Sequence, residues 1–208
     1  FENKNRPFHT HPQFVNYGID DFNYALSKAH YFETEIKRDG VILYDSGSYT
    51  LARRRKLDYT EIRDRAQKYF DDKFGRANQF LKGVTFYCED GDCRMASFHL
   101  HQSVENFLRT IPMVFILYGH KSHDLSELMN AAKKHTTEIF KAFPRDTAEE
   151  KRLFDLLQRV YIESRYNPDF EITKADIDAL LPKIGQLRDI VEKVCRERIA
   201  YYDSQSGK

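Results

Sequence analysis

The sequence has little cysteine, almost no net charge and no long apolar run, and each shortage excludes a class of protein. Its three cysteines, Cys88, Cys93 and Cys195, form neither a Cys-x-x-Cys pair nor a set of Cys and His ligands, so neither disulfides nor structural zinc are expected. With 33 Lys and Arg against 32 Asp and Glu, a strongly basic nucleic-acid binder is disfavoured. The longest apolar run, residues 113–118, is far shorter than the roughly 18 to 20 residues that span a bilayer. No signal-peptide pattern precedes it. We therefore expect a cytoplasmic protein with no membrane contact.

What the sequence does contain is enough apolar material for a folded, helical core. Hydrophobic residues make up 41% of the 208 residues, including 16 Phe and 13 Tyr, whereas disordered chains have few aromatics. From Asp58 onward, apolar residues recur at spacings of three and four, which predicts amphipathic helices. The predicted helices cover residues 60–87 and 93–118, a short stretch from 124 to 132, a stretch from 146 or 147 to 166, and one from 173 through 194.

Several residues are expected to begin, end or bend these helices. Asp124 is placed to cap the short helix, and Thr173 with Asp176 resembles a capping box. Gly119 suits the end of the second helix, while Pro112 and Pro182 lie within helices and predict kinks. Four long helices and one short helix, joined by short loops, predict an antiparallel up-and-down bundle over residues 58–208.

Residues 1–57 differ in composition and apolar pattern from the rest of the sequence and predict a small α/β segment. The pattern around residues 22–29 fits a short amphipathic helix, and residues 35–45 contain the turn dipeptide Asp39-Gly40 followed by Val-Ile-Leu-Tyr. That run is expected to form one or two strands. Because an isolated pair of strands is at best marginally stable, these strands need a sheet that the sequence hardly supplies.

Three short motifs in the helical part resemble a HEPN domain. They are HQSVEN at residues 101–106, KSHDL at 121–125 and YIESRY at 161–166. The resemblance covers about 150 residues from Asp58 onward. It implies a helical bundle of a kind often fused to minimal nucleotidyltransferase domains, commonly bacterial, and often homodimeric. Some HEPN proteins are metal-independent ribonucleases.

Residues 31–45 look like the closing strands of such a nucleotidyltransferase domain, the rest of whose sheet would be encoded upstream of Phe1. Residues 1–57 are accordingly interpreted as its C-terminal remnant, which makes an upstream nucleotidyltransferase domain an expected partner. That family requires Gly-Ser followed by Asp-x-Asp to hold Mg²⁺. Gly47-Ser48 has no such acidic pair at a suitable distance, so the catalytic metal site is not expected within this sequence.

HEPN ribonucleases use an Arg followed, after four to six residues, by a His. Arg165 matches that Arg, but residues 166–172 contain no His, so we assign no catalytic residue. A catalytic alternative keeps His123 as a non-consensus base acting with Arg165. No metal site is expected, because His99 and His101 lie on opposite sides of a helix and nothing completes a ligand set around His120 and His123.

A polar group within the bundle remains as the candidate site. Gln102, Glu105 and Arg109 share one helix face, and Glu105 is expected to pair with Arg165. The candidate nucleotide-binding residues are Gln102, Glu105, Arg109, His123, Asp124, Tyr161, Arg165 and Tyr166. One interpretation is a nucleotide site in which guanidinium binds phosphate and Tyr161 or Tyr166 stacks on a base. The other is structural: a helix cap at Asp124 and a Glu–Arg pair that sets helix register.

The sequence leaves three functions open. The first is a non-catalytic accessory domain of a bacterial nucleotidyltransferase, which binds a nucleotide or nucleotide-bearing substrate and dimerises. It needs no resident cofactor, with a magnesium nucleotide as the possible ligand. The second is a HEPN ribonuclease or toxin-like enzyme, and the third is a purely structural dimerisation module.

Overall fold

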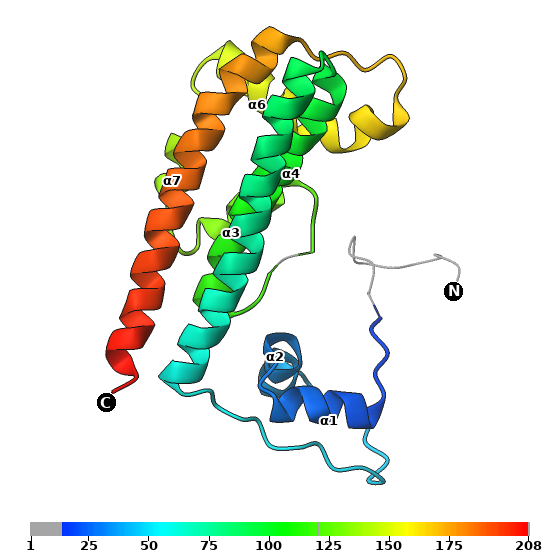
Figure 1. The fold of residues 1–208 in the computed structure, drawn as a ribbon. Helices are drawn as coiled ribbons and strands as arrows, with labels where there is room; N and C mark the ends of the chain where they lie inside the picture. Colours follow the sequence, from blue (N-terminus) through cyan, green and yellow to red (C-terminus); the bar gives the residue numbers. More distant parts are fainter. Residues whose placement is uncertain (1–13, 120, 208) are drawn as a thin grey trace, which may run out of the picture. The chain divides into compact units, whose positions relative to one another are not determined.

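The computed structural model describes residues 14–119 and 121–207, which form two compact units divided between Lys56 and Leu57. Within these residues every regular element is a helix (Figure 1). The mainly helical class is therefore confirmed. Among the described helices, none combines the length and the apolar character needed to cross a membrane.

The first unit is built on two short helices, α1 (Ile19–Ser27) and α2 (Tyr31–Asp39). The helix expected around residues 22–29 is confirmed as α1, which buries Phe22, Ala25 and Leu26. The Tyr17 hydroxyl donates to the buried Glu33 carboxylate at 2.6 Å.

The strands predicted for residues 35–45 are not formed, so the α/β character of this segment is wrong for the described residues. Residues 35–39 belong to α2, and residues 41–44 lie outside any regular element. Val41, Ile42, Leu43 and Tyr44 are 81%, 69%, 94% and 85% exposed. A strand needs a neighbour to bond its backbone groups, whereas a helix bonds its own, so without a neighbouring strand residues 35–39 are helical.

The second unit contains the predicted four long helices and one short helix. They are α3 (Tyr59–Glu89), α4 (Cys93–Ile116), α5 (Leu125–Ala132), α6 (Ala148–Tyr166) and α7 (Lys174–Gln205). A short 3₁₀ helix, η1 (Glu138–Lys141), was not predicted. Its four residues are too few to show a helical repeat in the sequence.

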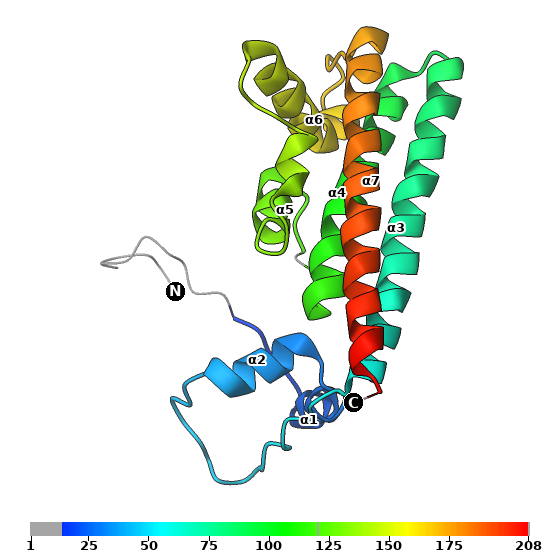
Figure 2. The ribbon, with the colours of Figure 1, turned by 90° about the vertical axis from the view of Figure 1, so that its left-hand side faces the viewer.

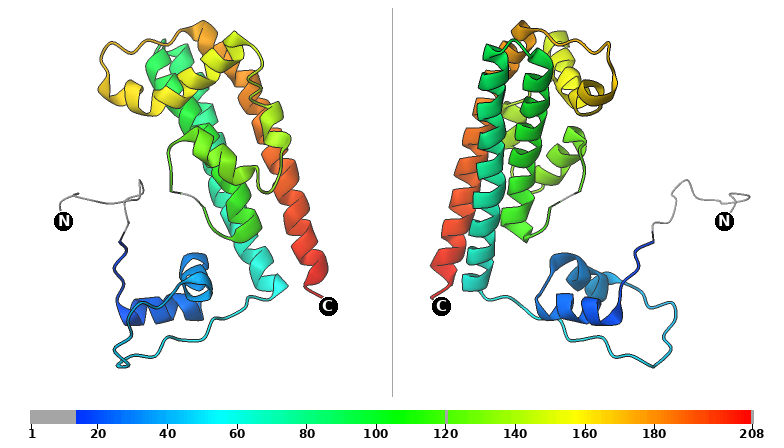
Figure 3. Two further views of the ribbon diagram at one scale, coloured as in Figure 1. Left: turned by 180° about the vertical axis from the view of Figure 1, so that it is seen from behind. Right: turned by 45° about the vertical axis from the view of Figure 1, so that its right-hand side comes forward.

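Helices α3, α4 and α7 run in the alternating directions predicted for an up-and-down bundle. Tyr202 near the end of α7 donates to the Phe115 carbonyl near the end of α4, at 2.9 Å. Arg63 near the start of α3 pairs with Asp203 of α7 at 2.6 Å. Helices α4 and α7 therefore run parallel to each other and antiparallel to α3, and the views in Figures 2 and 3 show the three side by side.

Helix α6 is the long helix that departs from this alternation, because it crosses one end of the bundle. Arg152 near the start of α6 pairs with Asp176 at the start of α7, and Arg94 at the start of α4 bonds the end of α6. The chain between α4 and α6 thus returns to the end at which α4 begins. From there α7 can only run in the direction of α4.

Helix caps follow the sequence closely, with one exception. Asp124 accepts from the Glu127 amide at 3.0 Å, and Thr173 forms a capping box with Asp176, both as predicted. Gly119 does not end α4. The helix ends at Ile116 with Leu117 in the left-handed region at φ 56°, while Gly119 lies against the Met113 side chain.

Helix α4 is the centre of the second unit. It packs against α3, α5, α6 and α7, and Leu100, Phe107 and Ile111 on it are fully buried. It also buries polar side chains, which is unusual unless they are hydrogen-bonded. Two of these, His101 and Glu105, face the junction with α5 and α6, where the candidate site lies.

Candidate functional site

The Glu105 carboxylate is the centre of a buried polar cluster. Its residue is only 2% exposed, and a buried carboxylate is costly unless charges and hydrogen bonds compensate it. Oε1 lies 3.0 Å from Arg109 Nη1, and Oε2 lies 2.9 Å from His123 Nδ1. Gln102 donates to Oε2 at 3.2 Å. Three of the predicted side chains therefore converge on Glu105.

Hydrogen bonds from Arg109 of α4 and to Gln158 of α6 hold the segment that precedes α5 in place. Arg109 donates to the Ser122 carbonyl at 2.6 Å, and the Ser122 hydroxyl donates to the Glu127 carboxylate at 2.6 Å. The Leu125 amide donates to Gln158 of α6 at 2.9 Å. His123 is thus fixed from both sides, although about half of its side chain is exposed.

Tyr161 of α6 forms the aromatic part of the site. The His123 ring stacks on it with centroids 4.0 Å apart and planes 13° apart, and the Arg165 guanidinium carbon lies 3.9 Å from its centroid. These two groups would collide if they shared one face of the ring, so they cover opposite faces. The buried His101 ring adds a third contact at 5.3 Å.

His101 is an uncharged packing group at neutral pH. Burial, followed by the positive field of His123, Arg165 and Arg109, lowers the pKa of His101 to about 4. Its residue is fully buried, and neither ring nitrogen has a hydrogen-bond partner among the described residues. Its Nδ1 lies 3.9 Å from Glu105 Oε2, beyond hydrogen-bond distance.

The predicted pair between Glu105 and Arg165 does not form. Arg109, one turn along the same helix, takes the position next to Glu105, and the rings of His123 and Tyr161 lie between Glu105 and Arg165. Arg165 instead donates from Nε to the Tyr161 carbonyl at 2.7 Å. Its guanidinium is exposed, and in the described part of the chain no carboxylate is within ion-pair distance of it.

Arg94 is the residue that sequence reasoning missed. Its guanidinium donates to the carbonyls of Ser164 and Asn167 at 2.6 Å each, and more weakly to those of Glu163 and Pro168. These carbonyls lie in the last turn of α6 and just beyond it, where helix carbonyls run out of partners within the helix. Arg94 therefore fixes the turn that carries Arg165. No spacing in the sequence could reveal a contact between residues 70 positions apart.

The remaining candidates are placed as follows. Asp124 caps α5, as the structural interpretation expects, and it is not part of the Glu105 cluster. Tyr166 is 72% exposed, with the Arg165 guanidinium 4.9 Å from its ring centroid. His99 packs on Phe80 and Tyr87, away from His101, while His120 lies outside the described residues. Where the structure describes the chain, no group of three His, Cys, Asp or Glu side chains could hold a metal ion.

Together these features define a helical-bundle domain with a buried Glu–Arg–His cluster and an exposed Arg–Tyr surface at the end of α6. The family model of the HEPN domain matches residues 71–194, which is more than half of the chain. The chain therefore belongs to the HEPN domain family. No match to a curated protein was found.

Proposed function

We propose that the chain is a non-catalytic accessory domain of a bacterial nucleotidyltransferase that binds a magnesium nucleotide or a nucleotide-bearing substrate. The observation that carries the proposal is the state of Arg165. Its guanidinium is exposed, has no carboxylate partner among the described residues, and is oriented by the Tyr161 carbonyl and two tyrosine rings. An arginine held in this way presents a planar set of donors to phosphate oxygens.

The arrangement assigns different roles to the two tyrosines. Both faces of Tyr161 are covered, one by His123 and the other by Arg165, so this ring orients the guanidinium and offers no face to a base. Tyr166 is 72% exposed and adjoins the same guanidinium. A base stacked on Tyr166 would place its phosphates within reach of Arg165.

The non-catalytic role is supported by the separation of His123 from Arg165. A general base must come within hydrogen-bond reach of the proton that it removes from the substrate. A phosphate bound to Arg165 lies across the Tyr161 ring from His123, whose Nδ1 is already engaged by Glu105. The two residues are therefore badly placed to act on one phosphodiester.

The proposed partners are supported by exposed apolar side chains. In the first unit the run Val41–Ile42–Leu43–Tyr44 is almost fully exposed, which suits a strand that pairs with a nucleotidyltransferase domain. In the second unit Ile162 and Tyr166, one turn apart on α6, are 63% and 72% exposed. We propose that this side of α6 contributes to a homodimer.

Thermal melting with and without ATP, GTP, CTP and UTP plus Mg²⁺ tests nucleotide binding. We expect one nucleotide to raise the melting temperature, and a hundredfold excess over its Kd to stabilise the fold by about 2.7 kcal/mol. Arg165→Ala should abolish the rise. Arg159→Ala is the matched control, because Arg159 lies on the same helix and has Glu163 as a partner at 4.0 Å. No rise with any nucleotide would leave the structural dimerisation module as the function.

One observation favours the ribonuclease as a second candidate. The Glu105 carboxylate orients His123 through Nδ1, which is the arrangement of an orienting acid and a histidine base. If this candidate is right, the protein should cleave single-stranded RNA without metal, and His123→Ala should abolish cleavage. His99→Ala is the control, since His99 lies elsewhere on α4.

A further inference from the structure

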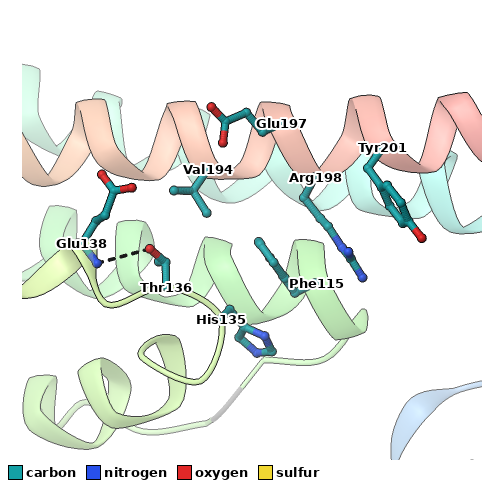
Figure 4. A pocket seen from close by; sticks show the side chains of 8 residues that line it. All are labelled: Phe115, His135, Thr136, Glu138, Val194, Glu197, Arg198 and Tyr201. Atoms are coloured by element: carbon teal, nitrogen blue, oxygen red, sulfur yellow. Dashed lines mark hydrogen bonds between the residues drawn. The ribbon is translucent and has the colours of Figure 1, made fainter.

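A hollow of about 370 Å³ lies between the end of α4, the segment after α5 and the second half of α7. We call it the Arg198 hollow. Figure 4 shows it from close by, lined by Phe115, His135, Thr136, Glu138, Val194, Glu197, Arg198 and Tyr201. It shares no residue with the cluster around Glu105 and Tyr161.

Arg198 is a cation without a counter-ion in this hollow. Its guanidinium lies against three aromatic rings, with its carbon 5.1, 4.9 and 4.6 Å from the centroids of Phe115, Tyr201 and Tyr202. Among the described residues no carboxylate is within ion-pair distance, and its Nε is buried without any hydrogen-bond partner. A buried donor without a hydrogen-bond partner lowers the stability of the fold, so the unpartnered Nε of Arg198 calls for an explanation.

The other arginines of the same helix show the contrast. Arg196 pairs with Glu192 at 2.8 Å, and Arg188 pairs with Asp189 at 2.8 Å. The Arg198 side chain is instead held in place by stacking, which leaves its planar set of donors uncommitted. Tyr202, one of the rings in contact with the guanidinium, is itself fixed by its bond to the Phe115 carbonyl, so this contact is in place before any ligand binds.

His135 and Thr136 add donors on the opposite side of the hollow. The His135 ring lies 4.9 Å from the Phe115 ring, and burial, then the charges of Arg198 and Lys134, lower the pKa of His135. It is therefore neutral at pH 7 and has one N–H to donate. The Thr136 oxygen accepts from the Glu138 amide at 3.2 Å, which leaves its hydroxyl hydrogen to donate.

Among the described residues, neither of the two carboxylates that line the hollow forms an ion pair with Arg198. Glu138 lies 3.8 Å from Lys141 and 3.7 Å from Lys193, which compensate its charge. Glu197 also lines the hollow, and in Figure 4 its side chain points away from the Arg198 side chain. The charges that act on His135 in the hollow, those of Arg198 and Lys134, are both positive.

We propose that the Arg198 hollow is an anion-binding site for the phosphate group of a small phosphomonoester. Arg198 supplies the charge and the planar donors, His135 and Thr136 supply further hydrogen bonds, and Phe115 and Tyr201 form apolar walls beside the ester group. The volume exceeds what a bare ion needs and lies within the range of small-ligand pockets, about 300 to 1,000 Å³.

The test is an NMR titration of the His135 imidazole with inorganic phosphate and with phenyl phosphate, at constant ionic strength maintained with chloride. A bound anion should raise the pKa of His135, because it opposes the field of Arg198. We expect a saturable shift with both phosphates, at lower concentration for phenyl phosphate, and none with chloride.

Variants locate the effect. Arg198→Gln should weaken phosphate binding at least tenfold, and the matched control Arg188→Gln on the same helix should leave it unchanged. Thr136→Val should weaken it severalfold, which keeps the test valid if Arg198→Gln fails to fold. A titration that does not saturate, or that Arg198→Gln and Thr136→Val leave unchanged, would overturn the proposal. Because the readout is at His135, failure of the nucleotide site at Arg165 would be seen separately.

Discussion

Replacing Glu105 with glutamine removes one negative charge from the centre of the bundle and keeps the size of the side chain. In the structure this carboxylate receives Arg109 at 3.0 Å and His123 at 2.9 Å, in a place where only 2% of the residue is exposed. The substitution leaves the Arg109 cation without its partner. The amide also keeps only one acceptor oxygen, so it cannot accept from both Arg109 and His123.

The expected loss of stability follows from the surroundings of Arg109. Removing one member of a buried ion pair costs about 3 to 5 kcal/mol, because the other charge stays buried. The Arg109 side chain is 21% exposed and keeps its bond to the Ser122 carbonyl, so water screens part of the loss and about 2 to 3 kcal/mol is expected. At about 2 to 4 °C per kcal/mol for a domain of this size, the melting temperature should fall by roughly 4 to 12 °C.

A double-mutant cycle in urea unfolding measures the pair directly. The variants are Glu105→Gln, Arg109→Gln and the combination, with an expected coupling energy of about 2 kcal/mol. The control cycle uses Glu192 and Arg196, an exposed pair at 2.8 Å on α7, for which at most about 0.5 kcal/mol is expected. If the Glu105–Arg109 coupling does not exceed that of the control pair, the carboxylate is not the electrostatic centre of the cluster.

Three further predictions concern other parts of the second unit. Arg94→Ala should destabilise the fold by about 2 to 4 kcal/mol in urea unfolding, since a cation bonded to several terminal carbonyls of α6 is lost; a change below about 0.5 kcal/mol would refute the role of Arg94. Because the folded-state pKa of His101 is about 4 against an ordinary 6.5, the unfolded chain binds more protons between these values, and stability falls by up to about 3 kcal/mol from pH 6.5 to pH 4. His101→Phe should flatten that pH dependence, and an unchanged slope would contradict it. Burial raises the pKa of Cys195 to about 12, so iodoacetamide at pH 8 should label Cys195 only after unfolding, as mass spectrometry can show against the partly exposed Cys93.

The helix boundaries of the second unit were predictable because they depend on neighbours in sequence. Asp124, Thr147 and Thr173 cap helices through bonds to amides three residues ahead, a distance that the sequence displays directly. The exception is at Gly119, where Leu117 takes the left-handed conformation instead and Gly119 lies against the Met113 side chain of the same helix. The apolar spacing also predicted which faces of α3, α4 and α7 are buried.

The first unit shows where local pattern misled the prediction. Residues 41–44 have the composition of a buried strand, yet they are exposed and lie outside any regular element. Strand formation depends on bonds to another segment, which composition cannot supply. Helix formation in residues 31–39 requires no such partner.

In the candidate site, the sequence by itself determined the helix face shared by Gln102, Glu105 and Arg109. Only the tertiary structure decided the pairing, because several cations compete for one carboxylate and the packing of α5 and α6 selects between them. In the structure Glu105 pairs with Arg109 and His123, whereas Arg165 lies on the opposite face of the Tyr161 ring from His123. The arginines of α7 differ in the same way: two of them pair with carboxylates on their own helix, whereas Arg198 lies against aromatic rings. Charge and spacing along a chain limit what can pair, whereas burial and the competition among neighbours decide what does.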